Sequence, residues 1–207
     1  MMMKDKMLEY ERSLYKQGFD LIAGVDEVGR GPLYGPVVVA AVILPKDYYV
    51  DGLDDSKKLT PKKREKLYDI ILENALDISI FEVSSQEIDE INILNATKKA
   101  MYNAIKGLKT IPNHVLIDAV NLEDLTIPST SIIKGDAKSA SIAAASIVAK
   151  VHRDRMLIEE EKIHPGYGFD KHKGYGTKLH IEKIKELGVL ENHRKSFEPI
   201  KSMLNGS

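Results

Sequence analysis

The sequence contains no cysteine, no long apolar run and no excess of one charge. Without cysteine it can form neither disulfides nor thiolate metal sites, which fits a reducing compartment. Its longest purely apolar run, Val37–Leu44, is far shorter than the roughly 20 residues of a membrane-spanning helix. The charged N-terminus, Met1–Arg12, lacks the apolar core of a signal peptide. We therefore expect a cytoplasmic protein that does not contact a membrane.

The near-neutral charge, with 30 Lys and Arg against 31 Asp and Glu, does not by itself indicate a nucleic-acid-binding protein. The distribution is more informative. Six basic residues stand against one acid between Lys57 and Lys66, and five lysines stand against two acids between Lys162 and Lys183. Either cluster alone is typical of a solvated surface. Together with the acids described below, they favour a groove for a polyanion.

The 207 residues, 43% of them hydrophobic, suffice for one domain with an appended helical lobe. Apolar runs between turn residues predict strands at Leu21–Val28, Val37–Leu44, Ile78–Val83, Val115–Ile117 and Thr130–Lys134. Helical patterns predict helices at Met3–Gln17, Pro61–Leu76, Asn92–Leu108, Ala137–Glu161 and Thr177–Leu187, with a short one starting near Ser84. This order predicts an α/β fold in which a hairpin and a third antiparallel strand join helix-linked strands in one mixed sheet. We expect a catalytic domain at 1–160 and a basic helical lobe at 161–207.

Two adjacent acids, Asp26 and Glu27, close the first apolar strand, and a Gly-Arg-Gly turn follows them. A charge beside a core must be paired, metal-bound or neutralised. Strands also end in acids where they meet solvent, and glycine-rich turns join many hairpins. Consecutive strand residues face opposite sides of a sheet, so a shared site predicts a bend or bulge near Glu27.

Two further acids, Asp118 and Asp136, stand at a strand end and at a strand-to-helix junction. Alone, Asp136 would be read as a helix N-cap and Asp118 as the start of a turn. Neighbouring strands bring their ends together, so all four acids could converge. Four ionised carboxylates in one place repel one another, and divalent cations such as Mg²⁺ or Mn²⁺ relieve that repulsion.

Several motifs in order resemble bacterial ribonuclease HII over about residues 21–199. They are Asp26-Glu27-Val28-Gly29-Arg30-Gly31, Asp55-Ser56-Lys57, Leu116-Ile117-Asp118, Lys134-Gly135-Asp136, Ala144–Lys150 and His172-Lys173-Gly174-Tyr175. The resemblance implies a ribonuclease H-like fold with a five-stranded mixed sheet flanked by helices. It also implies an endonuclease that cleaves RNA in RNA–DNA hybrids and incises on the 5′ side of single ribonucleotides in duplex DNA. The ends expected are a 3′-hydroxyl and a 5′-phosphate.

The resemblance assigns a role to each matching residue. The metal-binding catalytic acids of the family match Asp26, Glu27, Asp118 and Asp136, with two Mg²⁺ or Mn²⁺ ions expected when substrate is bound. The family element that reads the ribose 2′-hydroxyl matches Gly29, Arg30 and Gly31, and the family tyrosine that packs on the neighbouring deoxyribose matches Tyr175. The 2′-hydroxyl is the group that distinguishes RNA from DNA at one nucleotide. Phosphate contacts are expected from Ser56, Lys57, Lys138 and Ser139.

Other functions make different demands on the sequence. The six histidines show no carboxylate–histidine spacing typical of a metal site, so surface or packing roles are expected. The related ribonuclease HIII would carry Lys in place of Arg30 and a further domain before the acids. A transposase or junction resolvase would lack the Asp-Glu pair followed by Gly-Arg-Gly, and a hybrid-binding module without catalysis would need no acids. The C-terminus shows no glutamine-led aromatic peptide for a sliding clamp, and a monomer is expected.

Overall fold

A computed structural model describes residues 2–53 and 59–206. Ser56 and Lys57, which were expected to contact phosphates, lie outside the described residues. No helix in the described part of the chain combines the length and the apolarity needed to cross a membrane.

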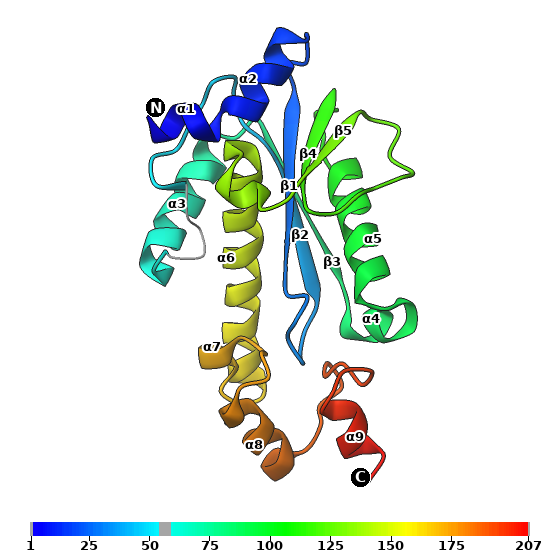
Figure 1. Ribbon diagram of the computed structural model, residues 1–207. Helices are drawn as coiled ribbons and strands as arrows, with labels where there is room; N and C mark the ends of the chain where they lie inside the picture. The colour runs from blue at the N-terminus through cyan, green and yellow to red at the C-terminus, as the bar shows by residue number, and fades with distance from the viewer. Residues whose placement is uncertain (1, 54–58, 207) are drawn as a thin grey trace.

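A five-stranded mixed sheet forms the centre of the molecule, as the sequence predicted (Figure 1). Its strands are β1 (Ile22–Val28), β2 (Val37–Ile43), β3 (Asp77–Val83), β4 (His114–Asp118) and β5 (Ser129–Ile132). They lie in the order β3-β2-β1-β4-β5. The first three are antiparallel neighbours, and β1, β4 and β5 run parallel. The carboxyl ends of β1 and β4 therefore meet at one edge.

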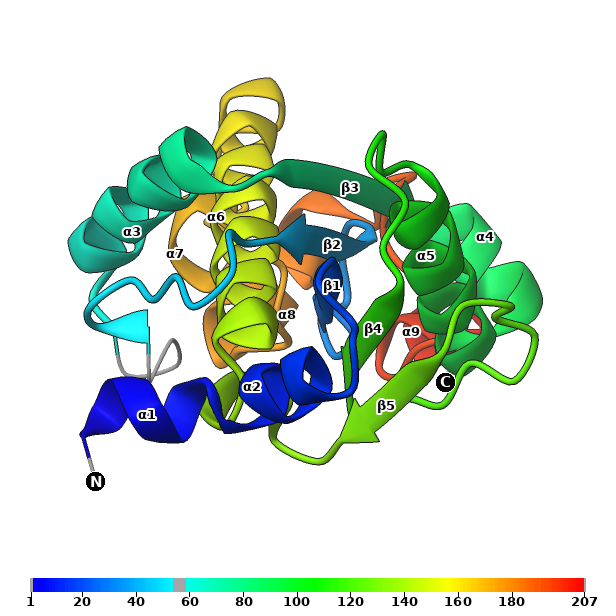
Figure 2. The same ribbon diagram turned by 90° about the horizontal axis from the view of Figure 1, so that it is seen from above.

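Helices cover both faces of the sheet (Figure 2). The N-terminal half contributes α1 (Met3–Met7), α2 (Glu9–Lys16), α3 (Pro61–Asn74), α4 (Ser85–Ile91) and α5 (Ile93–Lys106). After β5 come a 3₁₀ turn, η2 (Gly135–Ala137), and then α6 (Ala140–Ile163), α7 (Phe169–His172), α8 (Lys178–Leu187) and α9 (Ile200–Leu204). One face of the sheet packs its apolar side chains against α6 and α3, and the other face packs against α5.

The long helix α6 is central, as its small residues predicted. It lies so close to β1 that a Cβ atom at Gly24 would come within 2.0 Å of the Ser141 backbone carbon. Only glycine allows this approach. The close packing fixes the start of α6, just after Asp136, relative to the strand that carries Asp26.

The N-terminal segment differs from the single helix expected at Met3–Gln17. Two helices, α1 and α2, are separated at Leu8, where the backbone leaves helical geometry. Met7 and Leu8 are both buried in the cluster of apolar residues that contains α6. The break at Leu8 therefore lies against the core and not at the surface.

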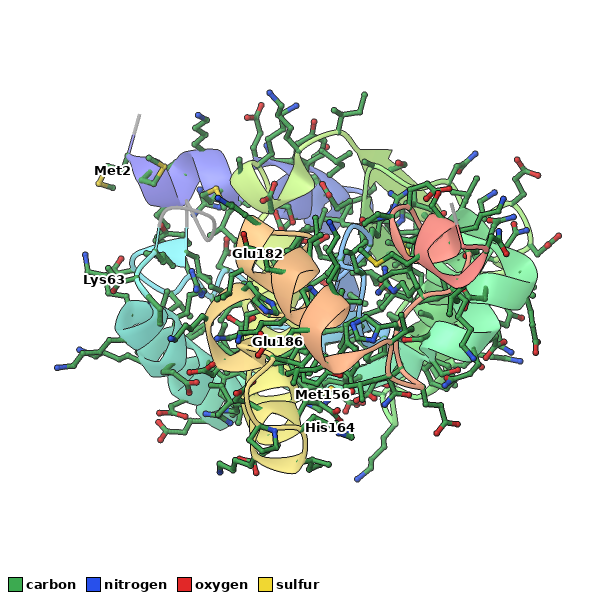
Figure 3. All side chains as sticks on the ribbon, turned by 90° about the horizontal axis from the view of Figure 1, so that it is seen from below. Met2, Lys63, Met156, His164, Glu182 and Glu186 are labelled. Carbon is green, nitrogen blue, oxygen red and sulfur yellow. The ribbon has the colours of Figure 1, made fainter. Side chains whose placement is uncertain are left out.

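The C-terminal segment packs at one end of α6 and returns toward the sheet. Figure 3 looks at this end, where the labels Glu182 and Glu186 mark α8. Tyr34, from the loop after β1, packs its ring 4.1 Å from the Phe169 ring of α7. Because α6 continues to Ile163, it crosses the boundary expected at residue 160. The basic segment is thus joined to the catalytic part by a continuous helix.

Candidate metal centre

The two adjacent acids lie on opposite faces of β1. The pairing of β1 with β2 matches Asp26 to Ala40 and Glu27 to Val39, and these partners belong to the apolar clusters on opposite sides of the sheet. The register between β1 and β2 is continuous, so the prediction of a bulge near Glu27 is wrong. Parallel pairing with β4 ends at Val25, which leaves the edge of β1 open beside the acids. The Glu27 amide donates a 2.7 Å hydrogen bond to Asp26 Oδ1, which turns the Asp26 carboxylate toward Glu27.

Three acids converge at the carboxyl ends of β1 and β4. Asp26, Glu27 and Asp118 each offer one oxygen, and these oxygens all lie within 4.8 Å of one another. Asp136 is outside this group of three but is buried in η2, immediately after Gly135. The Gly135 amide donates a 2.6 Å hydrogen bond to Asp118 Oδ1, so the turn carrying Asp136 is tied to the end of β4.

The electrostatics of the cluster oppose full ionisation. Burial raises the pKa of Asp26 well above its ordinary value, and the charges of Glu27, Asp118 and Asp136 raise it further. Burial also raises the pKa of Glu27, while the Arg30 guanidinium, 3.5 Å away, lowers it. These carboxylates lower their mutual repulsion by taking up protons or by binding a cation.

One atom of the cluster has no hydrogen-bond partner in the part of the chain that the structure describes. Glu27 Oε2 is buried and accepts no hydrogen bond from the described residues. A buried carboxylate oxygen without a partner is expensive. The group offers oxygen ligands alone, and hard divalent cations such as Mg²⁺ and Mn²⁺ prefer oxygen. The residues present therefore fit a divalent cation.

An open cavity of about 390 Å³ lies next to the acids, with the Gly-Arg-Gly turn and Tyr175 in its wall. A Cβ atom at Gly31 would lie 3.7 Å from Tyr175 Cε1, so the turn and the tyrosine are neighbours. Gly29 has a φ of +87°, and a Cβ there would come within 2.3 Å of Arg153 Nε. This backbone conformation and this contact both require glycine.

Three polar residues of the cavity wall had no role predicted from the sequence, although Ser146 and Lys150 lie in the motif Ala144–Lys150. They are Arg64 of α3, and Ser146 and Lys150 of α6. Ser146 and Lys150 stand four residues apart, a spacing that places both on one face of a helix. That spacing was the available signal. Asp154 pairs with Lys150 at 2.7 Å and lies 3.8 Å from Arg64, so it links the two cations.

Lys138 and Ser139, both expected to contact phosphate, differ in their surroundings. Lys138 is exposed. Ser139 is fully buried; its hydroxyl donates to Glu11 Oε1 at 2.6 Å and accepts from the Ile142 amide, as the N-cap of α6. A phosphate contact by Ser139 does not fit this placement. Glu11 lies 128 residues from Ser139 in the sequence, so no local pattern indicates this contact.

Two histidines of the C-terminal segment form a buried neutral pair. Their Nε2 atoms are 3.2 Å apart in His180 and His193. The Leu190 amide donates to His193 Nδ1, and His180 Nδ1 donates to the Tyr175 carbonyl, so His193 Nε2 donates to His180 Nε2. Burial lowers the pKa of each to about 4. These are packing residues, and the pair holds the backbone at Tyr175.

Comparison with known proteins gives a consistent result. A family model described as Ribonuclease HII matches residues 23–200. A protein of Bacillus cytotoxicus named Ribonuclease HII is 60% identical over 199 residues, which are 96% of this chain and 76% of that protein.

Solved structures share the fold. The ribonuclease H2 of Pyrococcus horikoshii OT3 superposes with a TM-score of 0.77 at 26% identity, covering 90% of this chain and 98% of that one. The ribonuclease HII of Archaeoglobus fulgidus, solved in complex with PCNA, gives a TM-score of 0.72 at 27% identity, covering 86% and 95%.

Proposed function

Since the chain belongs to the ribonuclease HII family and is a ribonuclease H enzyme, we propose that it incises duplex DNA on the 5′ side of a single embedded ribonucleotide, besides cleaving RNA in RNA–DNA hybrids. The observation that carries the proposal is the meeting of Asp26, Glu27 and Asp118 beside a cavity lined by Gly29–Gly31 and Tyr175. An acidic cluster suits metal-assisted phosphodiester hydrolysis, and the neighbouring backbone suits recognition of a sugar.

The four acids hold the metal ions in this proposal. Asp26, Glu27 and Asp118 supply the converging oxygens, and Asp136, buried in η2, is near enough for its charge to raise the pKa of Asp26. Two Mg²⁺ or Mn²⁺ ions held by these acids would supply activation of the attacking water and stabilisation of the leaving 3′-oxygen. Hydrolysis forms a bond from the water oxygen to phosphorus and breaks the bond from phosphorus to O3′, giving a 3′-hydroxyl and a 5′-phosphate.

Cationic side chains orient the backbone of the substrate strand. Arg64 and Lys150 line the cavity wall and present positive charge beside the acids. A second hollow shares these two residues and adds Lys171 and Lys173. Phosphate contacts fix the register of a duplex without reading its sequence. This strip gives the duplex a path from the acids toward the C-terminal segment.

Recognition of the ribonucleotide is assigned to the turn and to the tyrosine. Gly29, Arg30 and Gly31 bring bare backbone to the cavity, where an amide can bond the 2′-hydroxyl. The Tyr175 ring, 40% exposed and next to Gly31, packs on the following deoxyribose. Together they read a junction between RNA and DNA.

The deciding experiment uses one end-labelled duplex with a lone ribonucleotide and an otherwise identical all-DNA duplex. We expect Mg²⁺-dependent incision on the 5′ side of the ribonucleotide and an intact DNA control. Tight binding of both duplexes without strand scission would instead indicate a hybrid-binding module. Cleavage of long hybrids with no incision at the lone ribonucleotide would restrict the activity to hybrids.

A further inference from the structure

Arg194 is a fully buried arginine that contacts the Gly-Arg-Gly turn from behind. It is distant in sequence, yet its guanidinium donates to the Gly29 carbonyl at 2.5 Å and to the Arg30 carbonyl at 2.8 Å. It also donates twice to the Gly35 carbonyl, at 2.8 and 3.0 Å. The fixed fork of the guanidinium thus binds both ends of the loop that carries the turn.

The partners of Arg194 are unusual for a buried cation. Among the described residues, no carboxylate forms an ion pair with it, and backbone carbonyls take its hydrogen bonds. Burying a guanidinium costs free energy, which these carbonyls offset. An apolar residue could fill the same space without that cost, so the hydrogen bonds to the loop are the distinctive contribution of this side chain.

Because a peptide unit is planar, holding a carbonyl also fixes the direction of the N–H group of the next residue. In a trans peptide the C=O and the following N–H point to opposite sides of one plane. Holding the Gly29 and Arg30 carbonyls from behind therefore directs the amides of Arg30 and Gly31 away from Arg194. Both residues line the cavity beside the acids, and neither amide donates to another described residue.

The segment that carries Arg194 is itself anchored. The Asp89 carboxylate, on α4, accepts hydrogen bonds from the Lys195 amide at 2.8 Å and the Ser196 amide at 2.9 Å. The Ser85 hydroxyl, also on α4, donates to the Asn192 carbonyl at 2.7 Å. The two contacts flank Arg194 on both sides and hold it against the turn.

We infer that Arg194 is a positioning residue for substrate specificity: it fixes the turn so that the amides of Arg30 and Gly31 face the ribose 2′-hydroxyl. This role rests on the proposed function, because it assumes that the turn reads the sugar. Arg194 itself lies behind the turn and touches no substrate. Its loss should therefore reduce discrimination between ribose and deoxyribose more than it reduces duplex affinity or metal binding.

The test measures binding of two duplexes, one with a lone ribonucleotide and one all-DNA, in the Asp26→Asn background so that neither is cut. The readout is the ratio of the two dissociation constants. We expect Arg194→Lys, which keeps the charge but loses the fork, to lower this ratio by about tenfold, the size expected for one hydrogen bond. All-DNA binding should change less than twofold.

A matched substitution is Arg155→Lys, at an exposed arginine of α6 that pairs with Glu65, and it should keep the wild-type ratio. If Arg194→Lys does not fold, Asp89→Asn provides the same test, since it loosens the anchor and should lower the ratio by a smaller factor. An unchanged ratio in the folded variant, or an equal fall in Arg155→Lys, would overturn the role of Arg194. Absence of any ribose preference in the parent protein would instead overturn the proposed function.

Discussion

Asp118 accepts a 2.6 Å hydrogen bond from the Gly135 amide, which joins the end of β4 to the turn that carries Asp136. This contact links two acids that stand at different places in the sequence and the fold. Because η2 leads into α6, and α6 packs tightly on β1 at Gly24, the positions of all four acids depend on one another. The metal centre we propose is thus built from strand ends and one turn, held by the packing of α6.

Removing one acid should abolish incision while leaving the fold intact. Asp26→Asn and Asp136→Asn should each lower the rate in Mg²⁺ by at least about a thousandfold, because a ligand to the ions is lost. In metal-free buffer, Asp26→Asn should raise Tm, since burial and neighbouring charges oppose ionisation of Asp26. Gel assays and thermal melts measure the two effects. Normal cleavage by either variant would remove that acid from the mechanism.

Tyr175 should matter for the junction and not for the metal. Tyr175→Ala should slow incision at a lone ribonucleotide by about tenfold, consistent with loss of one stacking contact of roughly 1–3 kcal/mol. Tyr175→Phe keeps the ring and should remain near the parent rate. Mn²⁺ affinity, followed by calorimetry, should be the same in all three proteins. Unchanged kinetics in Tyr175→Ala would refute the role.

Lys138 and Ser139 are adjacent but should respond differently. Ser139→Ala removes the N-cap of α6 and should lower the free energy of unfolding by about 1–2 kcal/mol, measured in urea, with the salt dependence of duplex binding unchanged. Lys138→Ala should weaken binding and reduce the salt slope by about 1, with stability unaffected. A reduced salt slope in Ser139→Ala would restore its expected phosphate contact.

The buried histidine pair should make stability depend on pH. The pKa of His180 and His193 is lowered from 6.5 to about 4 in the folded protein, so between these values only the unfolded chain is protonated there. The free energy of unfolding is therefore highest above pH 6.5 as far as this pair is concerned. As the pH falls from 6.5 toward 4, each histidine lowers the free energy of unfolding by about 1.4 kcal/mol per pH unit.

Urea titrations at pH 7, 5.5 and 4.5 measure this dependence. His193→Gln should flatten the slope, because it removes one of the two buried imidazoles. Equal slopes in the parent protein and in His193→Gln would show that the pair does not titrate as its burial predicts.

The sheet could be predicted from the sequence because each strand is a short apolar run closed by turn residues. The run Val37–Leu44, observed as Val37–Ile43, is buried throughout, and Asp26 and Asp118 come at strand ends as expected. These signals are local, and the parallel pairing of β1 with β4 follows from the intervening helices. The convergence of acids at one edge was inferable for the same reason.

Contacts between distant segments were not predictable in this way. Nothing near Arg194 in the sequence indicates that it binds the carbonyls of Gly29 and Arg30, because backbone acceptors leave no residue pattern. The bulge expected at Glu27 is absent: β1 pairs with β2 without interruption there, and the Asp26 carboxylate instead accepts a hydrogen bond from the Glu27 amide. The first helix breaks at Leu8, a buried residue whose neighbours in the core come from distant segments.

The most direct measurement locates the metal ions themselves. Crystals of the protein with an uncleavable duplex that carries a 2′-hydroxyl at the junction, grown in Mn²⁺, would show the ions by anomalous diffraction. The account predicts two peaks bound by Asp26, Glu27, Asp118 and Asp136, with the 2′-hydroxyl next to Gly29–Gly31. Ions held elsewhere, or Asp26 and Asp136 too far apart to share them, would contradict it.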